Sequence, residues 1–291
     1  MSYDRRILYK EIFQDTMELC RTNETLSSVI ALSRQKQYII AEDKNCIVDK
    51  SRRYEKPAKV VVSKKRSLEA AGNKDYKGFK VCVHNFASAT KPGGGVENGA
   101  SAQEECICRC STLYPNLSVE TIYNDFYQQH KMHLKQGRMD ATYNDDCIFT
   151  PGVVVFKTDD PACQLMEEDA WYSVDVITCA APNLREKPSN AMNPGSGAKV
   201  SHLSVEQLKA LHQKRLRKIL SIAKKEKEEV IILGAFGCGA FQNPAWAVSE
   251  AFYEVVQEFL YDFQVIEFAV YCSPRNLRNY EAFSKVFLPQ K

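Results

Sequence analysis

Two spacings of hydrophobic residues alternate along the chain. Short apolar runs rich in β-branched residues are typical of strands, and those apolar throughout indicate strands buried on both faces. Between them, apolar residues recur every three or four positions, as on amphipathic helices. The predicted strands are 38–40, 60–62, 79–85, 152–156, 175–181, 229–233 and 265–271, and the predicted helices are an N-terminal segment ending near Thr22, then 67–71, 101–111, 118–136, 204–228 and 244–260. This alternation predicts an α/β fold with a mixed β-sheet between helices.

Length and composition narrow the class of protein. The chain has 291 residues, 44% of them hydrophobic and 26% charged, which excludes a disordered chain, a collagen and a coiled-coil rod. No internal repeat and no Gly/Pro-rich boundary divides it cleanly. We therefore expect an N-terminal helical extension, residues 1–58, packed on a core formed by residues 59–291.

The charge, the apolar stretches and the cysteines suggest where the protein works. Lys and Arg total 39 against 36 Asp and Glu, a net charge of +3, too even to predict direct binding of duplex nucleic acid. The basic stretch 49–59 is predicted to be a solvated surface loop rather than a polyanion site. No apolar stretch approaches the ~18 residues of a membrane span. We expect an intracellular, cytoplasmic monomer (nuclear in a eukaryote), away from membranes, whose 11 cysteines stay reduced.

A first glycine-rich segment, residues 85–95, leaves the predicted strand 79–85. It contains three consecutive glycines, Gly93, Gly94 and Gly95, and leads toward the helix that begins near Ser101. Consecutive glycines remove every side chain from the backbone, which permits positive φ and close approach of the main chain to a ligand. A flexible turn would also use glycines, so the triplet alone leaves both interpretations open.

A second glycine-rich segment, residues 234–244, follows the strand 229–233 and precedes a helix opened by Pro244. Asn243 fits the N-cap of that helix, and Pro is favoured at the first helical position. A strand, a glycine-rich loop and a helix N-terminus present backbone N–H groups and a positive dipole end to a phosphate. The spacing is not that of a P-loop, so this is not the motif of a nucleotide triphosphatase.

Two adjacent carboxylates, Glu104 and Glu105, stand at the start of the helix after the triplet. Ser101 and Glu104 fit a capping box, which explains Ser101 and Glu104 but not Glu105. Neighbouring helical residues point roughly 100° apart, so we expect one carboxylate to position and the other to react. A helix N-terminus favours the anion, and a bound diphosphate would raise the pKa again, so we expect the substrate to complete the acid.

These residues resemble a known family. Asn85, the triplet and then Gln103-Glu104-Glu105 are similar to the signature of the poly(ADP-ribose) glycohydrolases, and the residues Ala102–Leu117 resemble its compact microbial type. The segment GAFGCGAFQNP is similar to that family's diphosphate loop, and 180–183 also matches. The resemblance covers about Val60 to Phe283.

The resemblance implies a macrodomain-like fold and hydrolysis of the ribose–ribose O-glycosidic bond of poly(ADP-ribose). It implies that Glu105 is the catalytic acid/base and that Glu104 holds the adjacent ribose. It also implies the substrate-binding residues Asn85 and Phe241 for the distal ribose, Gly93, Gly94 and Gly95 for sugar and diphosphate, Gln103 beside them, and Gly237, Cys238, Gly239 and Ala240 for the diphosphate. It implies no cofactor and no metal.

The chain also departs from the family pattern. Val96 and Glu97 follow the triplet where bulkier or more neutral residues are expected. There is no counterpart to the accessory region or the tyrosine insertion of the animal enzymes, which favours cleavage from chain ends. The expected partners are poly(ADP-ribose), ADP-ribosylated proteins and ADP-ribose as product, and the expected role is the reversal of ADP-ribosylation, including in the DNA damage response.

Two other functions stay open at this stage. One is hydrolysis of a mono-ADP-ribosyl adduct. The other is a macrodomain that only binds ADP-ribose, against which the pair Glu104–Glu105 argues, since a binding module needs no acid.

Several other features are weaker signals. Cys106, Cys108 and Cys110 are predicted to be buried packing residues rather than zinc ligands, and Cys238 a small residue that fits its loop rather than a reactive thiol. His130 and His133 are predicted to lie on a solvated helix face. The basic helix residues between 214 and 227 are expected to be an exposed face. The loop 184–202 is either a cover over the ligand or a surface connection.

Overall fold

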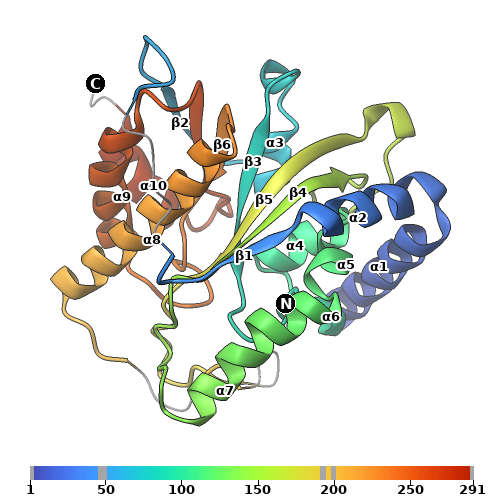
Figure 1. Cartoon of the computed structure of the whole chain (residues 1–291), viewed down its shortest axis with the longest axis horizontal. Helices are drawn as coiled ribbons and strands as arrows, with labels where there is room; N and C mark the ends of the chain where they lie inside the picture. Colours follow the sequence, from blue (N-terminus) through green and yellow to red (C-terminus); the bar gives the residue numbers. More distant parts are fainter. Residues whose placement is uncertain (1–2, 45–50, 191–194, 198–200, 289–291) are drawn as a thin grey trace.

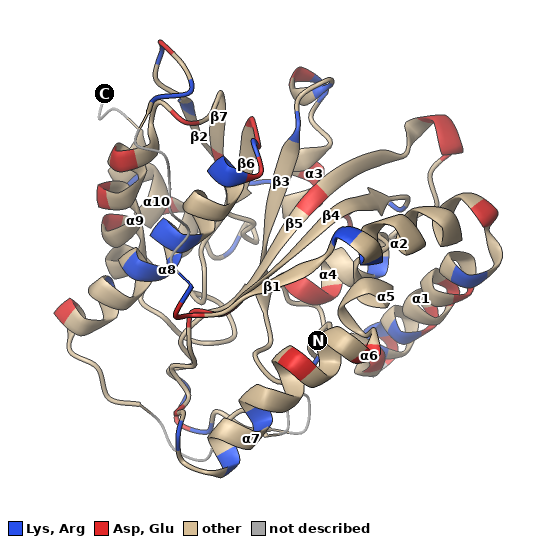
Figure 2. Cartoon of the chain, viewed as in Figure 1, with Lys and Arg blue, Asp and Glu red and all other residues tan. Residues whose placement is uncertain are grey.

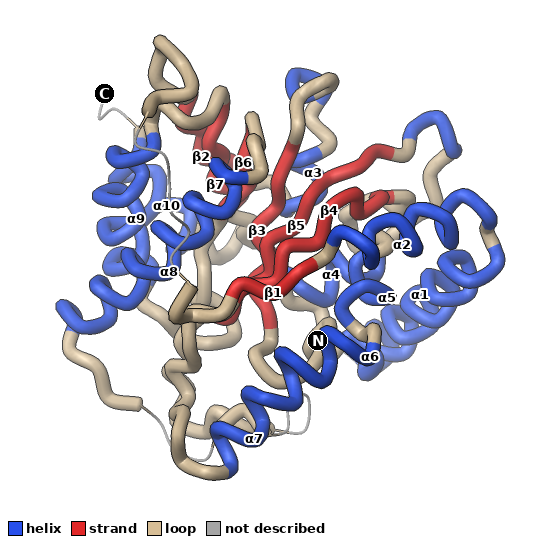
Figure 3. Tube along the Cα trace, in the orientation of Figure 1, coloured by secondary structure: helices blue, strands red, loops and turns tan. Residues whose placement is uncertain are grey.

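One mixed sheet organises the molecule in the computed structural model, which describes residues 3–44, 51–190, 195–197 and 201–288. Its strands in spatial order are β1 (Tyr38–Ile40), β4 (Cys147–Val155), β5 (Tyr172–Ala180), β3 (Val81–Ala87), β6 (Val230–Leu233), β7 (Val265–Ala269) and β2 (Lys59–Ser63). The strands from β5 to β2 run parallel, while β4 pairs antiparallel with β5 and β1 antiparallel with β4. Figure 3 shows the strands in red, with helices in blue to either side. The mixed sheet expected from the sequence is confirmed.

Helices cover the sheet on both sides (Figure 1). One face packs on α8 (Val205–Lys225), α9 (Ala245–Phe259) and α10 (Arg278–Phe287). The other faces α1 (Tyr3–Thr22), α3 (Ser67–Ala71), α4 (Gln103–Cys110) and α5 (Leu113–Leu117). Beside β4 lies α2 (Glu24–Lys36). The remaining elements are α6 (Glu120–Ile122), α7 (Gln129–Lys135) and the short turns η1 (Lys74–Tyr76), η2 (Val96–Asn98), η3 (Tyr123–Gln128) and η4 (Glu168–Ala170).

The predicted strands occur, with shifted ends. Every residue of β6 and β7 is buried, which is why their sequences are apolar throughout rather than alternating. The strand expected at 152–156 begins earlier, at Cys147, because a bulge between Thr150 and Val153 carries the strand across Pro151. Proline is tolerated at such irregularities but not inside a regular ladder, so the sequence pattern hid the first half of β4.

The predicted helices differ more. The N-terminal helix does end at Thr22, but a second helix, α2, starts directly after Asn23, whose side chain accepts from the N–H of Leu26. The helix expected over 118–136 is divided among α6, the π-helical η3 and α7, and α10 was not expected. The N-terminal segment also supplies β1 to the sheet. The boundary at residue 58 stays a prediction.

The basic segments are engaged by the fold. Residues 49–50 lie outside the described part, but Arg53 donates to the carbonyls of Glu228 and Asp262, and Arg52 lies 3.9 Å from the ring centroid of Tyr261. On α8, Arg215 is fully buried rather than exposed. Basic side chains of α8 pair with acidic ones of α9, as in Lys209–Glu250 and Arg217–Glu258. Figure 2 shows the basic positions of α8 in blue and the acidic positions of α9 in red. These basic side chains therefore already have partners within the fold.

No helix in the described ranges has the length and apolar character that crossing a membrane requires.

Candidate active site

A cavity of about 420 Å³ opens where the parallel strands end. Phe86, near the end of β3, Ala235, after β6, and Ala269, at the end of β7, line it. Both glycine-rich segments and the start of α4 form its walls. The carboxyl ends of parallel strands are where α/β proteins bind ligands, because the loops there converge.

The adjacent glutamates are held differently. Oε2 of Glu104 accepts from the N–H of Ser88 at 2.7 Å, and Oε1 accepts from Nδ2 of Asn85 at 3.4 Å. Glu105 accepts from the N–H of Gly95 at 2.9 Å through Oε1. Oε2 of Glu105 is buried and has no hydrogen-bond partner among the described residues. Glu104 is therefore fixed on both oxygens, while Glu105, which also lines the cavity, has one oxygen without a partner among the described residues.

Both carboxyl groups hold their protons more tightly than usual. Burial raises the pKa of Glu105, and the hydrogen bond from Gly95 opposes that rise. Burial, and then the charge of Glu105, raises the pKa of Glu104 well above its ordinary value. The expectation that the helix N-terminus would keep Glu105 anionic until substrate bound was wrong, because desolvation of a fully buried carboxylate outweighs the dipole of a short helix.

The glycine triplet lies directly over the carboxylates. Gly93 and Gly94 have φ of 63° and 56°. A Cβ on Gly94 would lie 2.7 Å from Oε1 of Glu105 and 3.1 Å from Oε2 of Glu104. The triplet thus lets the main chain approach both carboxylates, which a side chain at Gly94 would displace.

A short staple closes the loop that carries the triplet. Nζ of Lys91 lies 2.7 Å from Oε2 of Glu97, and the hydroxyl of Tyr114 donates to Oε1 of Glu97 at 2.9 Å. The ring of Tyr114 also packs beneath Gly93. Glu97, a departure from the family pattern, therefore pairs across the loop and points to Lys91 and Tyr114.

Gln103 braces the start of α4 against β3. Its Oε1 accepts from the N–H of Phe86 at 2.8 Å, and its Nε2 donates to the carbonyl of His84 at 2.7 Å and to Oγ of Ser67 at 3.0 Å. The predicted capping box is wrong: the N-cap is Ala102, and no side chain caps the helix. Glu104 turns away from the helix end toward Ser88, so it cannot reach back.

The second glycine-rich segment, residues 234–244, forms another wall of the cavity, here called the glycine-rich wall. Ala235, Gly237, Gly239, Ala240 and Phe241 line the cavity. The predicted capping role of Asn243 is wrong, since Pro244 is the N-cap of α9. Burial raises the pKa of the Cys238 thiol, which agrees with a small packing residue rather than a reactive thiolate.

The cavity brings most of the predicted residues together. Nine line it: Gly94, Gly95, Gln103, Glu104, Glu105, Gly237, Gly239, Ala240 and Phe241. Three do not: Gly93 lies against Tyr114, Cys238 lies behind the wall, and Asn85 is fully buried beneath Glu104. Asn85 thus touches Glu104 and not the cavity. The roles assigned to all twelve residues stay predictions.

Sequence reasoning missed the far side of the cavity, which Arg66, Asp159, Tyr271 and Asn279 help to line. The guanidinium of Arg66 lies 4.3 Å from the ring centroid of Tyr271. Arg66 and Tyr271 follow β2 and β7 by three and two residues. Their position after strand ends was the signal that could have identified them.

The cysteines and histidines form no metal site in the described ranges, where no group of three or more His, Cys, Asp or Glu side chains could hold an ion. Cys106, Cys108 and Cys110 are buried, as predicted. His130 is buried rather than solvated, and contacts the Ala89 carbonyl and Asp146, both at 2.9 Å.

Of the loop 184–202, residues 191–194 and 198–200 lie outside the described part; Arg185 and Asn190 line the cavity.

Comparisons agree with this geometry. The family model "Microbial-type PARG, catalytic domain" matches residues 14–158. The structure is similar to that of poly(ADP-ribose) glycohydrolase (PARG) from Thermomonospora curvata, with a TM-score of 0.81 and 28% sequence identity over 97% of this chain and 100% of that chain.

Two ligand-bound structures are also similar. The Thermomonospora curvata enzyme bound to the inhibitor ADP-HPD has a TM-score of 0.79 and 28% identity over 96% of this chain and 99% of that one. Poly(ADP-ribose) glycohydrolase from Deinococcus radiodurans in complex with ADP-ribose has a TM-score of 0.70 and 27% identity over 88% and 95%. A search of curated protein sequences found no match.

Proposed function

The chain belongs to the microbial-type poly(ADP-ribose) glycohydrolase family, and we propose that it hydrolyses the ribose–ribose O-glycosidic bonds of poly(ADP-ribose), mainly from chain ends, releasing ADP-ribose. The observation that carries this proposal is Glu105: a buried carboxyl that lines the cavity, has a raised pKa and has one oxygen without a partner among the described residues. Burial that raises the pKa of a carboxyl favours its protonated form, from which it can donate a proton.

Glu105 supplies both proton transfers in this mechanism. As the acid, it protonates the ribose oxygen that leaves when the glycosidic bond breaks, and the anomeric carbon becomes oxocarbenium-like. The resulting carboxylate then takes a proton from the water that attacks that carbon, which regenerates the acid. The N–H of Gly95 holds the other oxygen of Glu105 in place throughout.

Glu104 positions the sugar. Its two oxygens are fixed by Ser88 and Asn85, so its carboxyl can accept from or donate to a ribose hydroxyl without moving. Because Asn85 is buried and bonded to Glu104 and Thr178, we assign Asn85 a role through Glu104 rather than direct contact with the ribose.

The loop 234–243 receives the diphosphate. In the described part of the chain, no hydrogen bond uses the N–H groups of Gly239, Ala240 or Phe241, which line the cavity. Backbone N–H groups in a glycine-rich loop before a helix suit phosphate oxygens. The N–H of Cys238 already donates to Ala235, so we assign Cys238 to the shape of the loop.

The biological setting is a proposal of the same kind. We expect a monomer inside the cell that acts on ADP-ribosylated proteins and so reverses this modification, including in the DNA damage response. The free thiols of the described cysteines support a reducing compartment. A sedimentation measurement tests the monomer.

A substrate panel tests the function. Wild-type protein is incubated with poly(ADP-ribose) and with serine-, glutamate- and base-linked mono-ADP-ribosyl adducts, and released ADP-ribose is quantified. The proposal predicts fast release from polymer, with ADP-ribose as the main product, and slow release from the adducts. Faster release from any adduct, or binding of ADP-ribose without turnover at high enzyme concentration, would contradict it.

A further inference from the structure

Asn243 fastens the glycine-rich wall of the cavity to the end of β5. Its Nδ2 lies within hydrogen-bond distance of three carbonyl oxygens, those of Pro182 at 2.7 Å, Gly237 at 3.0 Å and Phe241 at 3.3 Å. Gly237 and Phe241 belong to the wall, whereas Pro182 follows β5. One side chain therefore links two segments that are far apart in sequence.

This arrangement fixes the orientation of the amide. Carbonyl oxygens accept only, so the side that faces three of them must be the NH₂ group of Asn243. Its oxygen, Oδ1, then faces Nε2 of His212, 2.9 Å away. Because Oδ1 accepts, Nε2 of His212 carries the proton, and the neutral ring is the Nε2–H tautomer. Nδ1 of His212 has no partner among the described residues.

Gly237 shows how closely the wall is fitted to Asn243. A Cβ on Gly237 would lie 2.6 Å from Nδ2 of Asn243 and 2.8 Å from Cβ of Ala181, and Gly237 has φ of 76°. The backbone N–H of Asn243 also donates to the carbonyl of Gly237 at 3.0 Å. The wall thus approaches the amide so closely that position 237 has no space for a side chain.

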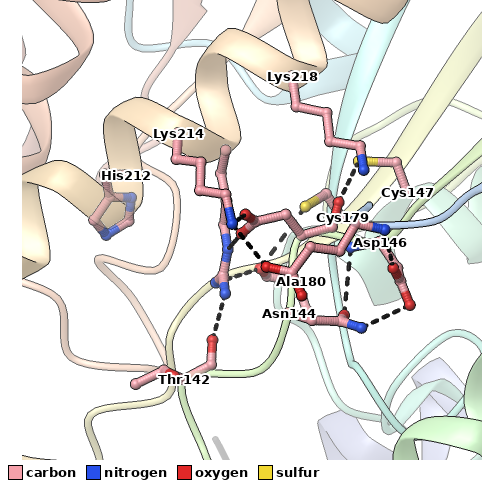
Figure 4. A network of polar contacts seen from close by, with 12 residues as sticks. Thr142, Asn144, Asp146, Cys147, Cys179, Ala180, His212, Lys214 and Lys218 are labelled. Carbon is pink, nitrogen blue, oxygen red and sulfur yellow. Dashed lines mark hydrogen bonds and ion pairs between the residues drawn. The ribbon is translucent and has the colours of Figure 1, made fainter. Parts of the chain in front are cut away.

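Helix α8 contacts both the end of β5 and the glycine-rich wall. His212 is fully buried on α8, and one turn later Arg215 donates to the carbonyl of Ala180 at 2.9 Å, to Thr142 and to Asp145. Figure 4 shows His212 on α8 next to the network around Ala180 and Thr142. The same helix face therefore holds the end of β5 through Arg215 and the glycine-rich wall through His212.

We propose that His212 and Asn243 form a positioning pair for this reaction. His212 orients the Asn243 amide, and this amide holds the glycine-rich wall, which receives the diphosphate, at a fixed spacing from the end of β5. This inference rests on the proposed function. The pair touches neither the cavity nor the glutamates, which lie on α4 with hydrogen bonds of their own. Its loss therefore weakens ligand binding and leaves the proton-transfer step intact.

The test compares ADP-ribose affinity, measured by calorimetry, with KM and kcat on polymer. His212→Leu leaves Oδ1 of Asn243 buried without a donor, so we expect the Kd and KM to rise about tenfold and kcat to stay within about twofold. His212→Gln keeps an amide donor and should recover most of the affinity. Asn243→Asp replaces the donors with acceptors facing three carbonyls and should lose at least as much.

His84→Leu is the matched control. His84 is also buried, and its ring makes no hydrogen bond in the described part. The centroid of the Phe236 ring lies 4.4 Å from that of His84 and 5.8 Å from that of His212. Melting curves establish that each variant folds. If His212→Leu does not fold, His212→Gln and Asn243→Asp carry the test: near-wild-type affinity for Gln and weakened affinity for Asp support the pair.

Three results would overturn the inference: unchanged affinity in His212→Leu or Asn243→Asp, an equal loss in His84→Leu, or a fall in kcat with unchanged Kd. Wild-type protein separates the two levels of the argument. If it neither binds ADP-ribose nor releases it from polymer, the proposed function fails; if it does both and the variants match it, only the positioning pair fails.

Discussion

Glu104 and Glu105 are neighbours in sequence with the same chemistry, yet their surroundings hold them differently. Ser88 and Asn85 donate to the two oxygens of Glu104, whereas one oxygen of Glu105 has no partner among the described residues. The sequence allowed the prediction that one positions and one reacts, because adjacent helical side chains diverge. It did not allow prediction of the raised pKa, because burial depends on residues from other strands and loops.

Gly94 offers a test of the close approach to the carboxylates. We expect Gly94→Ala to keep the fold and lose about 100-fold in kcat/KM, because the new methyl displaces Oε1 of Glu105 and misplacement of a catalytic group by about 1 Å has that effect. Gly137→Ala is the control: Gly137 has φ of 69°, and no atom of the described residues lies within 4 Å of its Cβ position. Activity of Gly94→Ala near that of Gly137→Ala would contradict the account.

The raised pKa of Glu105 also predicts a pH dependence of stability. The folded state keeps the proton to higher pH than the unfolded state, whose glutamates titrate at about 4.3, so the free energy of unfolding falls as pH rises through the folded pKa. Glu105→Gln removes that loss. Its melting temperature relative to wild type should therefore be higher at pH 8 than at pH 4. An equal difference at both pH values would refute this.

At the scale of elements, α1 supports the loop between the triplet and α4. A Cβ on Gly99 would lie 2.1 Å from the carbonyl oxygen of Arg6, and Arg109 of α4 donates to Ala100 while its guanidinium lies 4.3 Å from the ring of Tyr9. Thr16 donates to the carbonyl of Arg109 at 2.6 Å. The N-terminal helix thus contacts both segments that carry the glutamates and glycines.

Gly99→Ala should separate α1 from this loop. We expect the free energy of unfolding to fall by about 2 kcal/mol or more, because a backbone oxygen occupies the Cβ position and φ is 72°. Chemical denaturation measures the change, and Gly78→Ala, at φ of 91° with nothing nearby, gives the effect of conformation alone. Equal stability of the two variants would exclude support from α1.

The elements predicted from the sequence are those whose burial is regular. β3, β6 and β7 lie inside the sheet, so their apolar runs were sufficient. α10 and the π-helical η3 escaped prediction, because packing against distant elements overrides local preference. The roles of Ser101 and Asn243 were misjudged for the same reason: each fits a local capping rule, but tertiary contacts decide where the hydrogen bonds form.

At the scale of the whole molecule, the structure explains the near-equal numbers of basic and acidic residues. Lys209 and Arg217 of α8 pair with acidic side chains of α9, and the glycine-rich segment 234–244 carries no Lys or Arg. The sequence predicted the two loops that meet at the cavity, since glycine-rich segments after strands converge at one edge of a sheet. It did not show that Arg66, Asp159 and Tyr271 complete the cavity, because they stand alone in sequence.

Recognition by backbone amides predicts weak salt dependence. Between about 50 and about 200 mM salt, we expect KM for polymer to rise less than tenfold, whereas six to ten phosphate contacts by basic side chains would cost about 10³- to 10⁵-fold. Initial rates at several salt concentrations measure the slope. A slope of the steeper kind would show that a basic surface, not the glycine-rich wall, holds the polymer.

Glu105→Gln tests the central claim most directly, with ADP-ribose affinity measured by calorimetry and turnover measured on poly(ADP-ribose) in the same preparation. Gln keeps an oxygen for the N–H of Gly95 but has no acidic proton to transfer to the leaving ribose. We expect a Kd within about threefold of wild type and a kcat lower by about 10³-fold or more. Near-normal polymer hydrolysis by this variant would contradict the assignment of Glu105 as the acid.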